Sequence, residues 1–171
     1  MFINKMIGER IVHHDLDAVD LRILGRLQVD GRASHAQLAE VAHLSAPQCF
    51  RRVKRLEEQG SISGYCALLD RERIGLGVLA FVSVTLGGGR SQDLEKFRHV
   101  VAEIPEILEC HVVTGEADFL LKVVAADLHT FSNFLLKRLT QNFDSVTTRS
   151  EISLDQIKST SALPLPVVPR P

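Results

Sequence analysis

The sequence predicts an α+β protein in which three N-terminal helices precede a four-stranded antiparallel sheet with two helices on one face. Two observations support this prediction. Before residue 60, apolar residues recur at intervals of three or four positions, which is typical of amphipathic helices. After Gly75, apolar and polar residues alternate along several stretches, which is typical of strands that bury one face.

The first helix is expected to begin after Asp17, because an Asp at this position accepts hydrogen bonds from the unpaired N–H groups of a first turn. It should end near Val29, since Asp30-Gly31 supplies the left-handed conformation that closes many helices. Residues 1–15 are expected to form a loose tail. The buried stripe of this helix consists of Val19, Ile23, Leu24 and Leu27.

Two further helices are predicted, and each begins with the motif Ser-x-x-Gln. In this motif the two side chains bond backbone N–H groups at each other's position, which favours a helix start. The motif occurs at Ser34 and again at Ser45, so a short helix ending near His43 should meet, across a tight turn, a helix that runs to Gly60. The apolar stripe of the later helix consists of Cys49, Val53 and Leu56.

The helix that begins at Ser45 also has a cationic face. From Ser45 to Leu56 the chain contains three Arg, one Lys and no acidic residue, although its formal net charge is only -1. Taken alone, such a run is more often a solvated surface face. Here a helix and a tight turn precede it, and a helix-turn-helix places its second helix in the major groove of DNA. We therefore predict a DNA-binding surface on this helix.

The segment from Ile62 to Leu69 is predicted to form a short strand or hairpin, which would make the N-terminal part a winged helix-turn-helix. A unit of about 60 residues can only just form a hydrophobic core alone. We therefore expect this unit to lean on a partner or on the chain that follows.

Two stretches, LDAVDLRILGRLQVDGR and LAEVAHLSAPQCFRRVKRLEEQGSISGY, resemble the Lrp/AsnC family of prokaryotic transcription regulators, and the resemblance covers residues 16 to about 158. It implies that the helix after Ser45 is a DNA recognition helix. Many members have Pro and a hydroxyl residue where Ala46 and Pro47 stand here, a departure that concerns base preference. Arg51 and Arg52 could bond guanine or phosphate. The DNA-binding candidates are Ser34, Ser45, Pro47, Gln48, Arg51, Arg52, Lys54 and Arg55.

The second half of the chain is predicted to follow the order βαββαβ. Helices are expected from Ser91 to Pro105 and from Asp127 to about Leu139. This order describes a ferredoxin-like sheet with both helices on one face. The strands are expected at Val78–Leu86, Leu108–Val112, Phe119–Val124 and Val146–Leu154.

The stretch ILECHVVTGEADFLLKV resembles the effector-sensing domain of the same family, whose hallmark is a Gly-acid-x-Asp-aromatic turn. The resemblance implies a pocket between subunits for a free amino acid. Without it, an ordinary hairpin turn that needs Gly and tolerates acids would be the stronger explanation. The effector-binding candidates are Thr114, Gly115, Glu116, Ala117 and Asp118 in the turn, and Glu151, Ile152 and Ser153 on the last strand.

Composition restricts the remaining possibilities. Of the 171 residues, 45% are hydrophobic and 24% are charged, as in an ordinary globular protein. The three cysteines lack Cys-x-x-Cys spacing, which argues against a disulfide framework or a zinc site and favours a reducing cytoplasm. Cys110 and His111 are neighbours on a strand and point to opposite faces, so they should not share a site, and Cys110 is expected in the core. No signal peptide or membrane-spanning run is recognisable.

Together these features predict a cytoplasmic, nucleoid-associated transcription regulator that responds to an amino acid and needs no metal or cofactor. Two alternatives stay open: an architectural DNA-binding protein of low specificity, and an enzyme like the tetrapyrrole decarboxylases that share this two-part fold. A homodimer is expected because two-fold operators need two recognition helices. The resemblance extends this to four dimers in a ring. The expected parts are 1–15 (tail), 16–64 (DNA-binding), 65–75 (linker), 76–158 (ligand-binding and oligomerisation) and 159–171 (flexible Pro-rich end).

Overall fold

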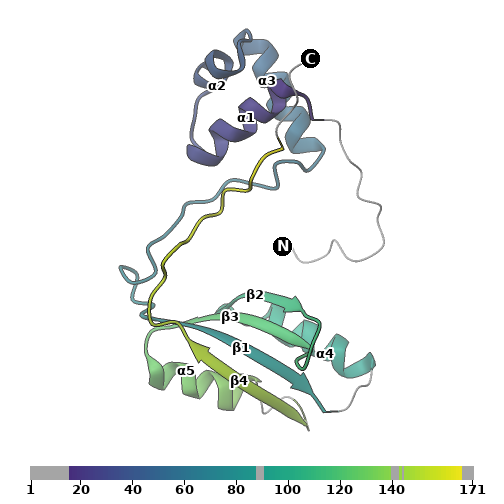
Figure 1. Cartoon of the computed structure of the whole chain (residues 1–171), viewed down its shortest axis with the longest axis vertical. Coiled ribbons are helices and arrows are strands. Elements are labelled where there is room, and N and C mark those ends of the chain that lie inside the picture. The colour runs from purple at the N-terminus through teal and green to yellow at the C-terminus, as the bar shows by residue number, and fades with distance from the viewer. Residues whose placement is uncertain (1–15, 88–90, 140–142, 144, 167–171) are drawn as a thin grey trace. The chain divides into compact units, whose positions relative to one another are not determined.

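The computed structural model describes residues 16–87, 91–139, 143 and 145–166, and its secondary structure is shown in Figure 1. The expected N-terminal tail, residues 1–15, lies outside these ranges. The described residues form two compact units. One, called here the helical unit, contains residues 16–68 and 158–166; the other, called the sheet unit, contains residues 69–157.

Three helices build the helical unit: α1 (Ala18–Val29), α2 (His35–Ala42) and α3 (Ala46–Glu58). All three begin where the sequence predicts. Asp17 accepts hydrogen bonds from the N–H groups of Val19 and Asp20. Ser34 Oγ accepts the N–H of Gln37 at the start of α2, and Gln48 Oε1 accepts the N–H of Ser45 at the start of α3. His43 adopts the left-handed conformation with φ 56°, and this residue makes the tight turn between α2 and α3.

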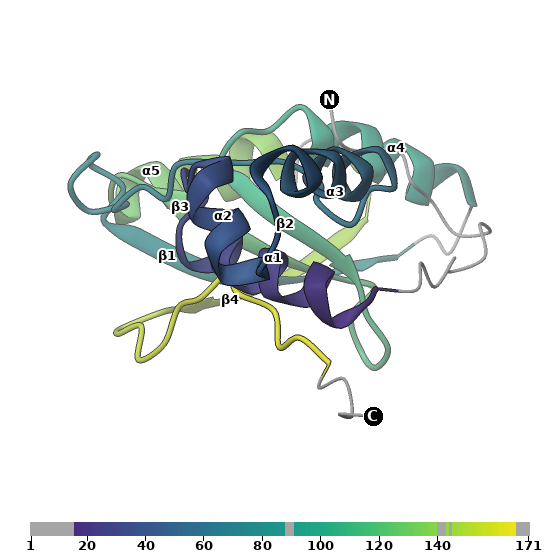
Figure 2. The same ribbon diagram turned by 90° about the horizontal axis from the view of Figure 1, so that it is seen from above.

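The three helices share one hydrophobic core, and Figures 1 and 2 show α1, α2 and α3 next to one another. The predicted stripe of α3 is confirmed, because Cys49, Val53 and Leu56 are all buried. Ile23 from α1 and Leu38 from α2 complete the packing. The core therefore fixes which face of α3 remains available to solvent.

The wing expected after α3 is not formed. Residues 61–77 contain no strand, so the prediction of a strand or hairpin over 62–69 was wrong. Ile62 packs against the helical core, but Leu68 and Leu69 are 77% and 70% exposed. Because these side chains meet no apolar surface in the described chain, alternation alone does not hold this segment in a hairpin.

The sheet unit confirms the predicted βαββαβ order and its ferredoxin-like arrangement. Its strands lie in the order β2-β3-β1-β4, and every neighbouring pair is antiparallel. A π-helical turn over Leu135–Leu139 follows α5, where the sequence predicted one continuous helix. The elements are β1 (Val78–Leu86), α4 (Ser91–Ala102), β2 (Ile107–Val112), β3 (Phe119–Ala125), α5 (Leu128–Phe134) and β4 (Val146–Ile152).

Alternate residues of β1 and β3 point into the core between the sheet and its two helices. Val82 and Val84 of β1 and Leu121 of β3 are fully buried, and the rings of Phe97 and Phe119 stack with centroids 4.3 Å apart. Cys110, predicted to be in the core, is instead exposed. It lies on β2, an edge strand whose side chains have a neighbouring strand on one side only. Among the described residues of the sheet unit, no helix covers the other face of the sheet, which includes Phe81, 39% exposed.

The Pro-rich tail was predicted to be a flexible end, but its described part packs against α1. Leu165 contacts the helical core, and Leu163 bonds the side chain of Gln28. Within the described ranges, every helix is too short or too polar to cross a membrane. The same ranges contain no group of three His, Cys, Asp or Glu residues that could hold a metal ion.

Candidate DNA interface and effector turn

The solvent-facing side of α3 is polar and begins at the N-terminus of the helix. Gln48 Oε1 accepts hydrogen bonds from both the N–H and the hydroxyl of Ser45, at 3.1 and 2.8 Å. Arg51 is exposed, and its Nε donates to the Pro47 carbonyl at 3.4 Å. Lys54 is exposed as well, and its ammonium group lies 3.7 Å from Glu58. A surface pair of this kind is weak and does not prevent Lys54 from binding a phosphate.

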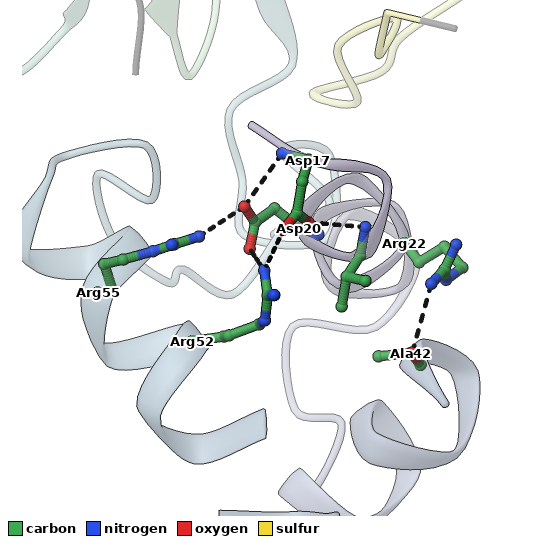
Figure 3. Close-up of polar contacts among 7 residues, drawn as sticks. Asp17, Asp20, Arg22, Ala42, Arg52 and Arg55 are labelled. Carbon is green, nitrogen blue, oxygen red and sulfur yellow. Dashed lines mark hydrogen bonds and ion pairs between the residues drawn. The ribbon is translucent and has the colours of Figure 1, made fainter. Parts of the chain in front are cut away.

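Arg52 and Arg55 have a different environment, which Figure 3 shows. Arg52 Nη1 donates to Asp17 Oδ2 at 2.6 Å and to Asp20 Oδ1 at 2.9 Å. Arg55 Nη2 donates to Asp20 Oδ2 at 2.5 Å. The Asp20 side chain is fully buried, and its Oδ2 also accepts the N–H of Asp17 at 3.2 Å. One carboxylate thus caps α1 and holds two cations of α3.

Arg52 and Arg55, which the sequence made candidates for DNA contact, thus have a structural role in holding the acids of α1. A buried carboxylate is costly unless it is paired, so Arg52 and Arg55 are needed to fasten α3 to α1. The hydrogen bonds that Arg52 donates to Asp17 and Asp20 raise the pKa of Arg52 above its ordinary value. Burial alone would raise the pKa of Asp17, but the N–H of Asp20 and the Arg52 guanidinium together hold it below its ordinary value.

The exposed Phe50 on this surface was missed by the sequence reasoning. Phe50 is 51% exposed on α3, and its ring lies 5.2 Å from the ring of His35 at the start of α2. An exposed apolar side chain in this position suits a thymine methyl group. Its signal in the sequence is that Phe50 falls outside the stripe of Cys49, Val53 and Leu56. Ser34 is exposed and caps α2, as expected.

The expected effector turn joins β2 to β3, and several hydrogen bonds fasten it to β1. Gly115 has φ 123°, a conformation that other residues rarely adopt, so the turn requires glycine here. Asp118 donates its N–H to the Val84 carbonyl at 2.9 Å, and its carboxylate accepts the N–H of Leu86 at 2.7 Å. The Thr85 hydroxyl donates to the Glu116 carbonyl at 3.2 Å. The Asp118 carboxylate therefore has a structural partner, whereas the Glu116 side chain is exposed.

The structure does not bring the two groups of effector candidates together within one subunit. The turn lies beside Val84 and Leu86, whereas Glu151 pairs with Phe81 and Ser153 donates its N–H to the Leu79 carbonyl. About five residues of β1 separate the two places, which is roughly 17 Å along a strand. They also lie on opposite sides of β1, next to β3 and β4 respectively. A site that contains both groups needs residues from two subunits.

Comparison with known proteins decides the family. The family model described as the AsnC-type helix-turn-helix domain matches residues 16–57, and the model of the Lrp/AsnC ligand binding domain matches residues 79–163. The chain belongs to the Lrp/AsnC family. It is therefore a DNA-binding transcriptional regulator in which a helix-turn-helix domain precedes a ligand-binding domain.

Individual relatives of this Lrp/AsnC protein agree with that assignment. It is 40% identical to the leucine-responsive regulatory protein of Rhizobium meliloti over 148 residues, which cover 86% of this chain and 95% of the relative. The Escherichia coli protein of that name is 38% identical over 87% of this chain and 91% of its own length. Neither the architectural nor the enzymatic alternative finds support among these proteins, which are named as regulatory proteins.

Solved structures show the same fold. A transcriptional regulator of Neisseria meningitidis in complex with L-methionine is similar with a TM-score of 0.82 and 38% identity, over 87% of this chain and 96% of that one. A feast or famine regulatory protein of Mycobacterium tuberculosis, complexed with L-methionine, gives a TM-score of 0.78 and 30% identity, over 86% and 98%. Both are regulators with a bound amino acid.

Proposed function

We propose that α3 of this Lrp/AsnC protein enters the DNA major groove and contacts the operator through Ser45, Pro47, Gln48, Arg51 and Lys54. The observation that carries this proposal is the division among the cations of α3. Arg52 and Arg55 bond the acids of α1, while Arg51 and Lys54 extend from the exposed face. Gln48 lies in the first turn, where side chains of a recognition helix reach base edges. Ser34, at the N-terminus of α2, would lie beside the DNA backbone, because the N–H groups at a helix start suit a phosphate.

Footprinting upstream of its own and neighbouring genes, followed by competition against random DNA, tests this function. We expect protection of a two-fold site and a clear preference for it over random DNA. Equal affinity for both would indicate an architectural protein instead. An absorbance band of a bound tetrapyrrole in the purified protein would favour the enzyme, which we regard as the weaker explanation.

The effector that we propose is a free amino acid, bound near the turn of residues 114–118. The turn offers backbone N–H groups for the carboxylate of the ligand, and Glu116 offers an exposed acceptor for its ammonium group. Asp118 acts indirectly, because its own carboxylate holds the turn against β1. L-Methionine and leucine are the first ligands to test, because the similar regulators described above carry the one or are named for the other.

We further propose a homodimer built on the helix-free face of the sheet, with dimers assembling into a larger ring in the cytoplasm. Phe81 and Leu120 are partly exposed on this face, and a second copy would bury them. The separation of the turn from Glu151, Ile152 and Ser153 supports an effector site between subunits. Light scattering measures the assembly, and a monomer that still binds its operator would contradict the proposal.

A further inference from the structure

The end of the chain returns to the helical unit and bonds α1 through a single residue. Gln28 Nε2 donates to the Leu163 carbonyl at 3.1 Å, and the Leu163 N–H donates to Gln28 Oε1 at 2.5 Å. One side-chain amide thus satisfies both backbone groups of one residue, as a neighbouring strand would. Leu163 itself is 72% exposed, so its backbone makes this contact.

Leu165 supplies an apolar contact two residues further on. It packs against the core of the helical unit, and its Cδ1 lies 3.6 Å from the position that a Cβ on Gly25 would occupy. Gly25 lies in the middle of α1, where glycine is less favourable to a helix than alanine. A Cβ at Gly25 would thus be in van der Waals contact with Leu165, which places the leucine directly over this point of α1. A residue with a larger side chain would occupy part of this space.

Two prolines flank the apolar contact. Pro164 and Pro166 fix their own φ angles and have no N–H group that would need a partner. A segment already extended by proline loses little conformational freedom when it binds a surface. A short segment can therefore dock with one residue's backbone and one leucine side chain.

We propose that residues 158–166, called here the strap, form a second tether between the two units and hold the helical unit in position for DNA binding. The linker after α3 is the first connection; the second runs from the end of β4 at Ile152 to Leu163 of the strap, which bonds α1. Two connections restrict the helical unit more than one does, and this restriction lowers the entropy lost when the protein binds DNA. The proposal rests on the DNA binding of the family and not on the assignment of contact residues to α3.

The strap also follows the last group of effector candidates in the chain. Glu151 and Ile152 on β4 and Ser153 just after it precede the strap by a few residues. The strap ends on α1, the helix whose Asp20 holds α3. A shift of β4 would therefore act on the support of α3 without passing through the linker.

The first experiment measures whether the strap is docked in solution. Hydrogen exchange of the Leu163 amide, read by mass spectrometry with fragmentation, is compared in wild type, Gln28→Ala and Ile157→Ala. Ile157, directly before the strap, is 96% exposed and serves as the control. We expect exchange about tenfold faster in Gln28→Ala, because two hydrogen bonds are lost, and no change in Ile157→Ala. Wild-type exchange as fast as that of Gln28→Ala would overturn docking.

The second experiment asks whether the strap docks on its own chain. Gly25→Cys and Leu165→Cys are combined in a chain that carries Cys66→Ser and Cys110→Ser, which removes the two exposed cysteines. A short bismaleimide should link the new pair within one chain, giving a monomer in denaturing electrophoresis. A linked dimer would show that strap and helix belong to different copies, and no link in the folded protein would overturn docking.

The third experiment measures the effect on DNA. Binding to a fragment that the wild-type protein footprints is compared for Gln28→Ala/Leu165→Ala and for Ile157→Ala. We expect the double variant to bind about tenfold more weakly with an unchanged salt dependence, because no phosphate contact is removed. Circular dichroism checks that α1 to α3 are intact. Unchanged affinity despite fast exchange at Leu163, or a smaller salt slope, would overturn the positioning role.

Discussion

Arg55 on α3 donates to the carboxylate of Asp20 on α1 over 2.5 Å, and that carboxylate is completely buried. Arg52 bonds the other oxygen of the same group. The two residues that fasten α3 are thus adjacent in sequence to Arg51 and Lys54, which face solvent. Within one helix, Arg52 and Arg55 hold α3 against α1, while Arg51 and Lys54 stay accessible to a ligand. Substitutions can measure the two contributions separately.

Asp20→Asn should destabilise the helical unit strongly. The amide has nearly the same shape but no charge, so Arg55 loses its anionic partner and Arg52 keeps only Asp17. We expect the free energy of unfolding to fall by about 3 kcal/mol, the range found when one partner of a buried ion pair is removed. Urea denaturation followed by circular dichroism measures it. Glu58→Gln, which breaks the exposed pair with Lys54, is the control and should cost less than about 0.5 kcal/mol. Equal losses in both variants would contradict the supporting role of Asp20.

Arg51→Ala and Lys54→Ala should each weaken DNA binding while the fold stays intact. If each side chain contacts a phosphate, the slope of log affinity against log salt should shrink by about one unit per substitution. Arg73→Ala removes an exposed cation from the linker and is the control. If Arg51 reads guanine instead, its loss should relax discrimination at one base pair. Full affinity in the Arg51→Ala/Lys54→Ala protein would rule out this face of α3.

The helices and strands could be predicted because their signals are local. Each Ser-x-x-Gln motif concerns residues three positions apart, and the alternation of Val82 and Val84 in β1 marks its buried face directly. The failed wing shows the limit of such signals. Leu68 and Leu69 have the composition of a strand, but a hairpin also needs an apolar surface to cover it.

The partners of the site residues could not be predicted, because they lie far away in sequence. Asp20 is 35 positions from Arg55 and 32 from Arg52, and Gln28 is 135 from Leu163. On a helical wheel, Arg52 lies at the edge of the buried stripe and Arg51 lies far from it, so the wheel predicts which arginine is less exposed. Only the packing of α1 against α3 shows which acids Arg52 bonds.

Tyr65 should ionise only at high pH. Burial and the hydrogen bond to Glu57 at 2.9 Å together raise the pKa of Tyr65 to about 12. Because the folded pKa exceeds the usual value of about 10, this contribution to stability is complete below pH 10 and is lost as the pH rises through the folded pKa. Tyr65 is the only tyrosine and the chain has no tryptophan, so tyrosinate absorbance after a rapid pH jump reports this residue alone. Glu57→Gln should lower the pKa part of the way to 10; an unchanged pKa would contradict the hydrogen bond.

The contribution of Asp17 to stability should depend on pH in the opposite sense to that of Tyr65. Burial acts to raise its pKa, but its bonds to the Asp20 N–H and to Arg52 lower the pKa below that of an unfolded aspartate. The contribution is therefore present above the ordinary value of about 3.9 and is lost as the pH falls through the folded pKa. The difference in unfolding free energy between wild type and Asp17→Asn should shrink as the solution is acidified from pH 6 to pH 3. A difference that stays constant over this range would contradict the ion pair.

Glu116→Gln should weaken amino acid binding without unfolding the sheet unit. Glu116 is exposed, and only its main-chain carbonyl bonds Thr85, so the side-chain change leaves the anchoring of the turn in place. We expect a loss of about tenfold or more in affinity, the usual cost of losing a hydrogen bond to a charged group. Isothermal titration with L-methionine and leucine measures it, and Glu95→Gln on α4 is the exposed control. Gly115→Val, which forces a branched residue to φ 123°, should abolish binding by reshaping the turn. If both turn variants bind the amino acid as tightly as wild type, the effector lies elsewhere.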